Sequence, residues 1–252
     1  MAEGITVETS ARVAHVRITR PEKKNALTTA MYADMADAFE WIADDDAVRV
    51  VIIEGGADFT AGNDLMDFMQ ASMRAASFED LPVLRFLGRL RDCQKPVVAA
   101  VRGNAIGIGT TMLLHCDAVV AARDARFRLP FVPLGLVPEA GSSLLLPLMV
   151  GRMRANWLLL SGDFFYADDA NAMGLITKLV DDEVVDSTAA EIAAQLALLP
   201  PVAVAETKRL LREPTAEQVA AQMEEEARAF SVRLASEEFR EAAMKLLARS
   251  NA

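Results

Sequence analysis

The segment KPVVAAVRGNAIGIG (residues 95–109) joins an apolar run to a turn rich in glycine. Residues 96–101 are almost all apolar, which is typical of a strand buried on both faces of a sheet. Three glycines within 103–109 end this run, and residues 110–115 favour the start of a short helix. We therefore expect a strand, a tight turn and a helix, with free backbone N–H groups at the turn.

The same order of strand, glycine turn and helix recurs along the chain. The apolar run 49–54 precedes the turn FTAGNDL (59–65), after which we expect a helix over residues 64–74. The run 118–122 predicts another buried strand, and the turn 135–141 leads into a further helix. Alternating strands and helices predict an α/β fold whose glycine turns face a common cleft.

The N-terminal part adds a half-buried pair of strands and a capped helix. Residues 5–7 and 14–18 alternate apolar and polar side chains, as strands at a sheet surface do. Thr28 can cap a helix. The apolar face of that helix repeats at helical spacing through Met31, Met35, Phe39 and Ile42.

The C-terminal part, residues 201–252, carries helical patterns only. Thr215 stands at capping-box spacing from Gln218, and Ser236 precedes two glutamates, so we expect helices to start at both positions. This segment is too short to hold a core of its own. We expect it to pack on the main domain, residues 1–200, or on another subunit.

Composition and charge narrow the class of protein. Hydrophobic residues make up 52% of the 252 residues and the formal charge is −10, which argues against nucleic acid or an anionic membrane as a partner. The N-terminus lacks the pattern of a signal peptide, and prolines or charges interrupt both long apolar stretches. Cys93 and Cys116 form no CxxC pair and predict free thiols in a reducing compartment. We expect a cytoplasmic protein.

Common catalytic motifs are missing from the sequence. It contains neither GxxxxGK[ST] nor GxGxxG nor a GxSxG elbow. His15 and His115, the two histidines of the chain, do not stand at metal-ligand spacing. We expect no metal site and no catalytic triad.

Six segments together resemble the enoyl-CoA hydratase/isomerase (crotonase) superfamily in order and approximate spacing. They are RPEKKNAL (20–27), FTAGNDL (59–65), KPVVAAVRGNAIGIG (95–109), CDAVVAARDARFRLP (116–130), LGLVPEAGSS (134–143) and PPVAVAETKRLL (200–211). The resemblance implies a crotonase-like ββα spiral core over residues 1–200. It further implies a C-terminal helical trimerisation or lid region over residues 201–252, and a homotrimer or a dimer of trimers.

The resemblance also implies an acyl-CoA thioester as substrate. Removing a proton beside the thioester carbonyl places negative charge on its oxygen, which two fixed N–H donors stabilise by several kcal/mol (roughly 3–4 each in well-studied cases). The family pattern assigns these donors to the backbone of Asn63 and Ile108. Position 108 is often glycine in relatives, but an N–H group survives the change to isoleucine if the local φ is negative.

Coenzyme A would be part of the substrate, so the resemblance implies no separate cofactor. By the same pattern, the residues expected to contact it are Lys24, Ala26, Ala61, Asn63, Asp64, Leu65, Met66 and Ile108. The basic loop around Arg20, Lys23 and Lys24 resembles the family's contact with the CoA phosphates. Further basic candidates on the tail are Lys208, Arg209 and Arg212.

Hydratases of this family use two glutamates, and the matching positions here hold Thr111 and Phe131. Glu139 is the one acid in an apolar stretch, in a PEAGSS context that looks most like the Δ3,Δ2-enoyl-CoA isomerases. Those enzymes move a proton from C2 to C4 with a single carboxylate. Burial would raise the pKa of Glu139, whereas a place at a helix start would lower it, so the sign stays open.

Three alternatives stay open at this level. A hydratase or lyase would need a second acid, for which Asp64 or Asp67 are the candidates. A non-catalytic acyl-CoA-binding protein would tolerate Glu139→Gln, and Glu139 could also be only a helix-start charge. The candidates for lining an acyl tunnel, or alternatively for plain core, are Met66, Met69, Met73 and Phe86.

Overall fold

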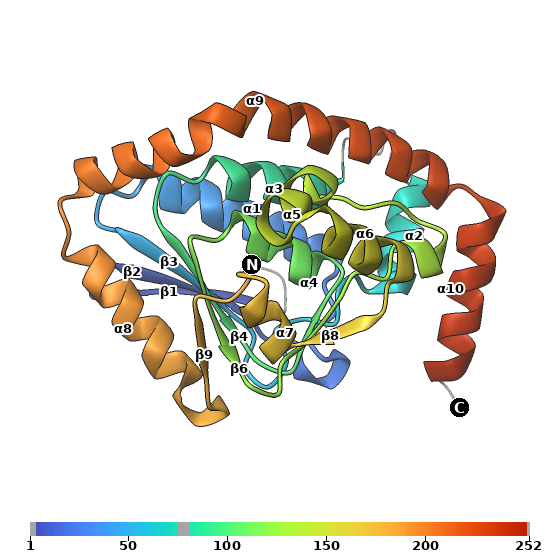
Figure 1. Cartoon of the computed structure of the whole chain (residues 1–252), viewed down its shortest axis with the longest axis horizontal. Helices are drawn as coiled ribbons and strands as arrows, with labels where there is room; N and C mark the ends of the chain where they lie inside the picture. Colours follow the sequence, from blue (N-terminus) through green and yellow to red (C-terminus); the bar gives the residue numbers. More distant parts are fainter. Residues whose placement is uncertain (1–3, 75–80, 251–252) are drawn as a thin grey trace.

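The computed structural model describes residues 4–74 and 81–250, and it confirms the expected α/β fold (Figure 1). The main sheet has six strands in the order β1-β2-β3-β4-β6-β9, and all neighbours except β1 and β2 run parallel. The strands are β1 (Ile5–Ser10), β2 (Val13–Ile18), β3 (Val50–Glu54), β4 (Val97–Val101), β6 (Ala118–Ala122) and β9 (Lys178–Val180).

The middle of this sheet is buried on both faces. All side chains of β4 and β6 are buried, as the apolar runs predict for parallel strands with helices on either side. Helix α8 (Val185–Ala197) packs against β3, β4 and β6. Helices α1 (Thr29–Asp44) and α3 (Pro82–Asp92) pack against each other on the opposite side (Figure 1).

A second, smaller sheet was not expected. It joins β5 (Asn104–Ile106), β7 (Arg126–Arg128) and β8 (Phe164–Tyr166) in that order. Each strand has three residues, which is too short for an alternating pattern to stand out in the sequence. The glycine turn predicted over 103–109 therefore contains a strand, and this strand sets the position of the residues that follow it.

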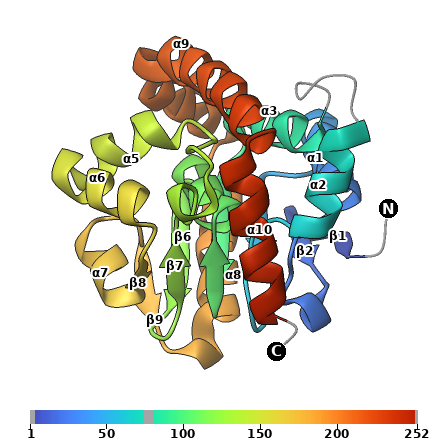
Figure 2. The ribbon, with the colours of Figure 1, turned by 90° about the vertical axis from the view of Figure 1, so that its right-hand side faces the viewer.

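The remaining helices connect the two sheets and form the C-terminal part. They are α2 (Leu65–Arg74), α4 (Ile108–Thr111), α5 (Ser142–Val150), α6 (Arg152–Ser161), α7 (Ala167–Ala172), α9 (Pro201–Leu234) and α10 (Glu237–Ser250), with short 3-10 turns at Pro21–Lys23, Met112–His115, Val132–Leu134 and Asp182–Val184. The long helix α9 crosses one side of the molecule, and α10 turns back across its end (Figures 1 and 2).

The three predicted helix starts had different outcomes. Ser236 caps α10, as expected, by accepting a hydrogen bond from the backbone N–H of Phe239 at 3.2 Å. Thr28 caps α1, as expected, by accepting a hydrogen bond from the backbone N–H of Met31. The start predicted at Thr215 is wrong, because α9 runs unbroken past it and past Pro214. The Thr215 hydroxyl donates to the carbonyl of Arg212 in the preceding turn, as a threonine inside a helix does.

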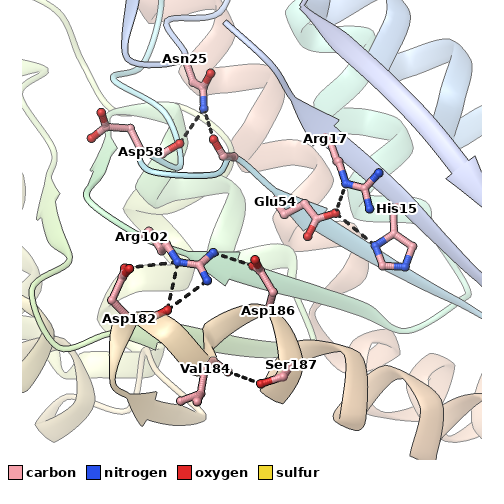
Figure 3. A network of polar contacts seen from close by, with 11 residues as sticks. His15, Arg17, Asn25, Glu54, Asp58, Arg102, Asp182, Val184, Asp186 and Ser187 are labelled. Carbon is pink, nitrogen blue, oxygen red and sulfur yellow. Dashed lines mark hydrogen bonds and ion pairs between the residues drawn. The ribbon is translucent and has the colours of Figure 1, made fainter. Parts of the chain in front are cut away.

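A side-chain network fastens the loops at one end of the main sheet (Figure 3). The Asn25 amide donates to the backbone carbonyls of Gly55 and Asp58, and the Asp58 carboxylate accepts from the N–H of Asn104 at 3.0 Å. Asn25 is 1% exposed, so these bonds are protected from water. They tie the loop around residue 25 to the turn before β5.

Among the described residues, no single helix has both the length and the apolar character of a membrane span. One bent pair, 182–197 with 201–234, passes that test of length and composition when its two helices are taken together, and they meet at 107°.

Candidate active site

A cavity of about 720 Å³ opens between the segment 61–68, the small sheet with the loop that follows it, and the C-terminal helices. Three of the residues that the sequence singled out, Asn63, Ile108 and Glu139, line it. Phe230 of α9 and Phe239 of α10 line it as well, so the C-terminal part supplies one of its walls. The cavity therefore brings together residues that lie far apart in the sequence.

Strand-like pairing holds the two amide-bearing segments side by side. Thr60 pairs with Ala105, and the N–H of Ile106 donates to the Thr60 carbonyl at 3.0 Å. At Gly62 a Cβ atom would lie 2.8 Å from the Ile106 carbonyl oxygen. Only glycine allows this approach, and its φ of 88° also favours glycine.

The backbone bonds around Asn63 leave its own N–H group free for a ligand. Leu27 donates to the carbonyl of Gly62 and accepts from the N–H of Asp64, each at 2.8 Å. In a parallel bridge of this kind, the N–H of the residue between them points away from the partner. Since Asn63 lines the cavity, this N–H group can face it.

Ile108 supplies the second candidate donor. It is the first residue of α4, so its N–H has no partner inside that helix. The turn before it places Gly107 at φ 57°, and the N–H of Gly107 donates to the Arg128 carbonyl. Ile108 keeps an ordinary helical backbone, so the isoleucine does not prevent its N–H from facing the cavity.

The sequence analysis missed Tyr32, a buried residue of α1 that contacts the side chain of Asn63. The Tyr32 hydroxyl donates a hydrogen bond to the Asn63 side-chain oxygen. Tyr32 is buried, and burial together with the nearby acids Glu139 and Asp67 raises its pKa well above the usual value. The hydroxyl therefore stays neutral and keeps its proton to donate. In the sequence Tyr32 is one more residue on the buried face of a helix.

The Glu139 carboxyl group faces this cavity with little contact to water. One oxygen accepts a hydrogen bond from the hydroxyl of Thr111, and the other is buried without a partner in the part of the chain that the structure describes. Burial raises the pKa of Glu139 to about 8; the bond from Thr111 opposes this shift, and the charge of Glu226 adds to it. Close to neutral pH such a carboxyl group can both take up and release a proton.

The interpretation of Glu139 as a helix-start charge is wrong. Helix α5 begins three residues later, at Ser142. The N–H groups of Gly141 and Ser143 at that helix start are taken by the carboxylate of Glu226, at 2.6 and 2.9 Å. The helix end therefore stabilises Glu226 as an anion, not Glu139, which is why burial dominates the pKa of Glu139.

The two aspartates that the sequence offers as a second acid are bound to other residues. Thr111 is hydrogen-bonded to Glu139, and Phe131 lines the cavity with an apolar ring. Asp64 pairs with Arg20 at 2.8 Å. Asp67 accepts hydrogen bonds from the backbone and hydroxyl of Thr29. Neither aspartate is among the residues that line the cavity.

The predicted ligand contacts divide into two groups. Ala61, Asn63, Leu65 and Ile108 line the cavity. The others lie outside its lining; these are Lys24, Ala26, Asp64 and Met66. The carbonyl of Ala26 accepts from Arg20, whereas Lys24 is exposed to solvent.

Of the basic candidates on the tail, Lys208 and Arg212 bind the main domain and Arg209 pairs within its own helix. Lys208 is 6% exposed, and its ammonium donates to the Lys95 carbonyl and to Asp117, both at 2.6 Å. Arg212 bonds the carbonyls of Arg91 and His115. Arg209 pairs with Glu206 and Glu213 along its own helix. These three residues line a separate hollow of about 330 Å³ between α3 and α9.

A small apolar hollow of about 30 Å³ continues from the cavity beyond Glu139. Its apolar lining comes from α2, α3 and α9, through Phe68, Val83, Leu84, Leu87, Met223, Ala227 and Phe230. The tunnel candidates Met66, Met69 and Phe86 are not in this lining, and the side chain of Met73 lies outside the described residues. Phe86 packs in the core against Tyr32 and Phe39.

Comparison with known proteins identifies relatives across nearly the whole chain. The family model "Enoyl-CoA hydratase/isomerase" matches residues 8–250. The chain is 36% identical to enoyl-CoA delta isomerase 2 of Rattus norvegicus over 98% of its length, and it spans 64% of that protein's length. It is 32% identical to 2,3-dehydroadipyl-CoA hydratase of Escherichia coli, with 93% of this chain and 91% of the relative covered.

The fold agrees with a solved structure of the same kind. A crystal structure of an enoyl-CoA hydratase/isomerase from Pseudoalteromonas atlantica superposes with a TM-score of 0.92 at 44% identity, and 98% of each chain is covered. Isomerases and hydratases stand at similar identity, so likeness alone does not select the reaction.

Proposed function

The chain belongs to the enoyl-CoA hydratase/isomerase family of acyl-CoA enzymes, and we propose that this member is a Δ3,Δ2-enoyl-CoA isomerase. In this reaction the double bond of a 3-enoyl-CoA moves into conjugation with the thioester. The observation that carries the proposal is the carboxyl group of Glu139 in the cavity, with one oxygen buried and the other bonded to Thr111. By the family resemblance, Thr111 and Phe131 stand where a hydratase holds its two glutamates.

The proton transfer needs one base. The Glu139 carboxylate takes a proton from C2, and the electron pair of that C–H bond forms a C1–C2 double bond as negative charge moves onto the thioester oxygen. Glu139 then returns the same proton to C4, the C3–C4 double bond shifts to C2–C3 and the carbonyl re-forms, so no water and no second acid are consumed. A carboxyl group with a pKa of about 8 suits both steps, because it takes up and gives back a proton with little bias near neutral pH.

The charge on the thioester oxygen is stabilised by the backbone N–H groups of Asn63 and Ile108. Both residues line the cavity that contains Glu139, and neither N–H is used by a neighbouring strand or helix turn in the described segments. Two donors fixed by the backbone need no rearrangement when the charge develops. Tyr32 restrains the Asn63 side chain and thereby the turn that carries the first donor.

We further propose that the CoA part of the substrate lies along Ala61, Leu65 and the exposed Lys24. Ala61 and Leu65 flank Asn63 on the cavity wall, and Lys24 is tied to them because its carbonyl accepts from the N–H of Ala61 at 2.9 Å. Ala26 lies in the loop of Lys24, whereas Asp64 and Met66 lie at the start of α2; these three would contribute through the backbone. The Lys24 ammonium would face the phosphates.

The test is an ultraviolet assay with 3-hexenoyl-CoA, in which the conjugated 2-enoyl thioester forms. We expect the wild-type protein to catalyse this and Glu139→Gln to lose it by a factor of about 10³, within the range for a proton-transfer group. The control is Glu241→Gln, an exposed acid at the α10 wall of the same cavity, which should retain activity.

Three outcomes would overturn the proposal. Water addition to crotonyl-CoA at a comparable rate would favour the hydratase, which the relative from Escherichia coli keeps as the second candidate. Full activity of Glu139→Gln would mean that another residue is the base. Binding of acyl-CoA without any turnover by the wild type would indicate a non-catalytic binding protein.

We also propose that the protein works as a homotrimer or a dimer of trimers, in the cytoplasm. Helix α6 carries Met153, Trp157 and Leu160, which are 81%, 65% and 66% exposed in the single chain. Neighbouring apolar side chains of this size on one helix are typical of a surface that another subunit covers. Light scattering should give three or six times the mass of the chain; a monomer would refute this part.

A further inference from the structure

We propose that Glu226, on the C-terminal helix α9, is a positioning residue that holds the backbone carrying Glu139 and thereby sets the direction of its side chain. This inference rests on the proposed function, because it assumes that Glu139 is the base. Glu226 lies 85 positions from the backbone it binds and is 5% exposed. It does not line the cavity or the small hollow beyond Glu139, so it acts without touching the substrate.

Glu226 binds the backbone directly after Glu139. One carboxylate oxygen accepts from the N–H of Gly141 at 2.6 Å. The other accepts from the N–H of Ser143 at 2.9 Å and also from its hydroxyl. Gln222, one helical turn earlier, donates to the same hydroxyl oxygen at 2.9 Å. Two residues of α9 therefore hold the start of α5 from one side.

The backbone between Glu139 and this anchor is bent in a way that needs support. Ala140 has φ 59° and Gly141 has φ 71°, and a left-handed alanine costs about 1 kcal/mol or more. The Ala140 carbonyl is bonded to the His115 ring nitrogen Nε2 at 2.7 Å. Burial lowers the pKa of His115 to about 4, so the ring is neutral and Nε2–H donates this bond. His115 and Glu226 thus hold this bend from two sides. The backbone that carries Glu139 is therefore fixed, and its side chain is directed at the cavity.

The charge of Glu226 also reaches Glu139. The groups that bond to Glu226 are the N–H of Gly141 and the N–H and hydroxyl of Ser143, and among the described residues no cation pairs with it. Burial raises the pKa of Glu226, and these donors, which favour its anion, oppose that shift. An unpaired buried anion repels a second one, and this repulsion adds to the raised pKa of Glu139.

The test compares the pH dependence of kcat/KM in the wild type and in Glu226→Gln. Glutamine keeps the shape of the side chain but removes the charge. Since a base must be ionised to act, activity rises with pH through the pKa of Glu139, about 8. We expect this limb to move to lower pH by about half a unit to one unit in Glu226→Gln. We also expect kcat to fall several-fold with KM nearly unchanged, because one backbone bond to the loop is lost.

The matched control is Glu224→Gln, an exposed acid two residues earlier on the same helix, which should leave the pH profile at wild type. If Glu226→Gln does not fold, Ser143→Ala is measured in its place, because this variant removes only the hydroxyl group that bonds to α9. A several-fold loss of kcat at unchanged KM supports the inference. An unchanged kcat and an unchanged pH profile overturn it.

The role of Glu139 as the base and the role of Glu226 in positioning it can be refuted separately. If Glu139→Gln abolishes activity while Glu226→Gln behaves as wild type, Glu139 remains the base and only the role of Glu226 is refuted. If Glu139→Gln stays active, the proposed function itself is refuted, whatever Glu226→Gln does.

Discussion

The two turns that carry the amides of Asn63 and Ile108 differ from the loop that carries Glu139 in how they reach the cavity. The turns are held by backbone pairing between neighbouring segments, 60–63 and 104–106. The loop is held by side chains of His115 and Glu226 that come from other parts of the chain. The position of a backbone N–H donor depends on the glycine next to it and little on the side chain of its own residue. The direction and the pKa of a side-chain base depend on all the residues that surround it.

Gly62→Ala should give the largest effect on the amide side of this comparison. The new Cβ would lie 2.8 Å from the Ile106 carbonyl oxygen, so the two segments must separate and the N–H of Asn63 must move. We expect kcat/KM for 3-hexenoyl-CoA to fall by about 100-fold, as when one donor to a developing oxyanion is removed.

The control for this prediction is Gly56→Ala. Gly56 also has a positive φ, 75°, but an added Cβ meets no atom within 4 Å. Both variants carry backbone strain of about 1 kcal/mol, so both should melt at somewhat lower temperature. Only Gly62→Ala should lose activity; equal activity in the two variants would refute the role of the close contact.

Thr111→Val tests how the residues around Glu139 set the pKa of its carboxyl group. The hydroxyl of Thr111 donates to Glu139 and holds the pKa of that group down, against burial. Valine has the same shape without the donor, so the pKa of Glu139 should rise by about one unit, and activity at pH 7 should fall about tenfold. The acid limb of the pH profile moves up, opposite to the shift expected for Glu226→Gln.

Thr110→Val is the neighbouring control, because the Thr110 hydroxyl donates to the Ala105 carbonyl and not to Glu139. It should cost some stability and leave the acid limb in place. A profile for Thr111→Val that coincides with that of Thr110→Val would show that the hydroxyl does not set the acidity of Glu139.

Ile108→Ala should give the smallest effect on activity. The side chain is 3% exposed, so truncation removes packing and should lower the free energy of unfolding by about 2 kcal/mol or more. The N–H group is kept, and kcat/KM measured well below the melting temperature should stay within about threefold of the wild type. A loss as large as that of Gly62→Ala would mean that the side chain, not the amide, is what position 108 contributes.

Local patterns predicted the fold where structure is local. The apolar runs became buried strands, and the glycine turns stand where they were expected, because burial and positive φ restrict the residues at each position. The helix start at Thr215 was wrong, since a capping pattern cannot compete with continuous packing along the core. The three-residue strands β5, β7 and β8 were missed because they carry no period.

Residue identity alone could nominate Glu139, as the one acid in an apolar stretch, but not its partners. Lys208 and Arg212 resembled anion-binding residues until their bonds to Asp117 were known. Glu226 resembled one more charge on a solvated helix, beside the exposed Glu224 and Glu225. Its helical position gave no sign of the backbone that it binds on another helix.

By itself, the sequence determined the buried strands of the main sheet, the glycine turns and the family to which the chain belongs. Only the tertiary structure decided which charges are buried, which N–H groups are free, and that the pKa of Glu139 is raised. The physical reason is that hydrophobic periodicity and backbone φ act between near neighbours, whereas desolvation and charge act through space. The acidity of a side chain therefore depends on which distant residues the fold places beside it.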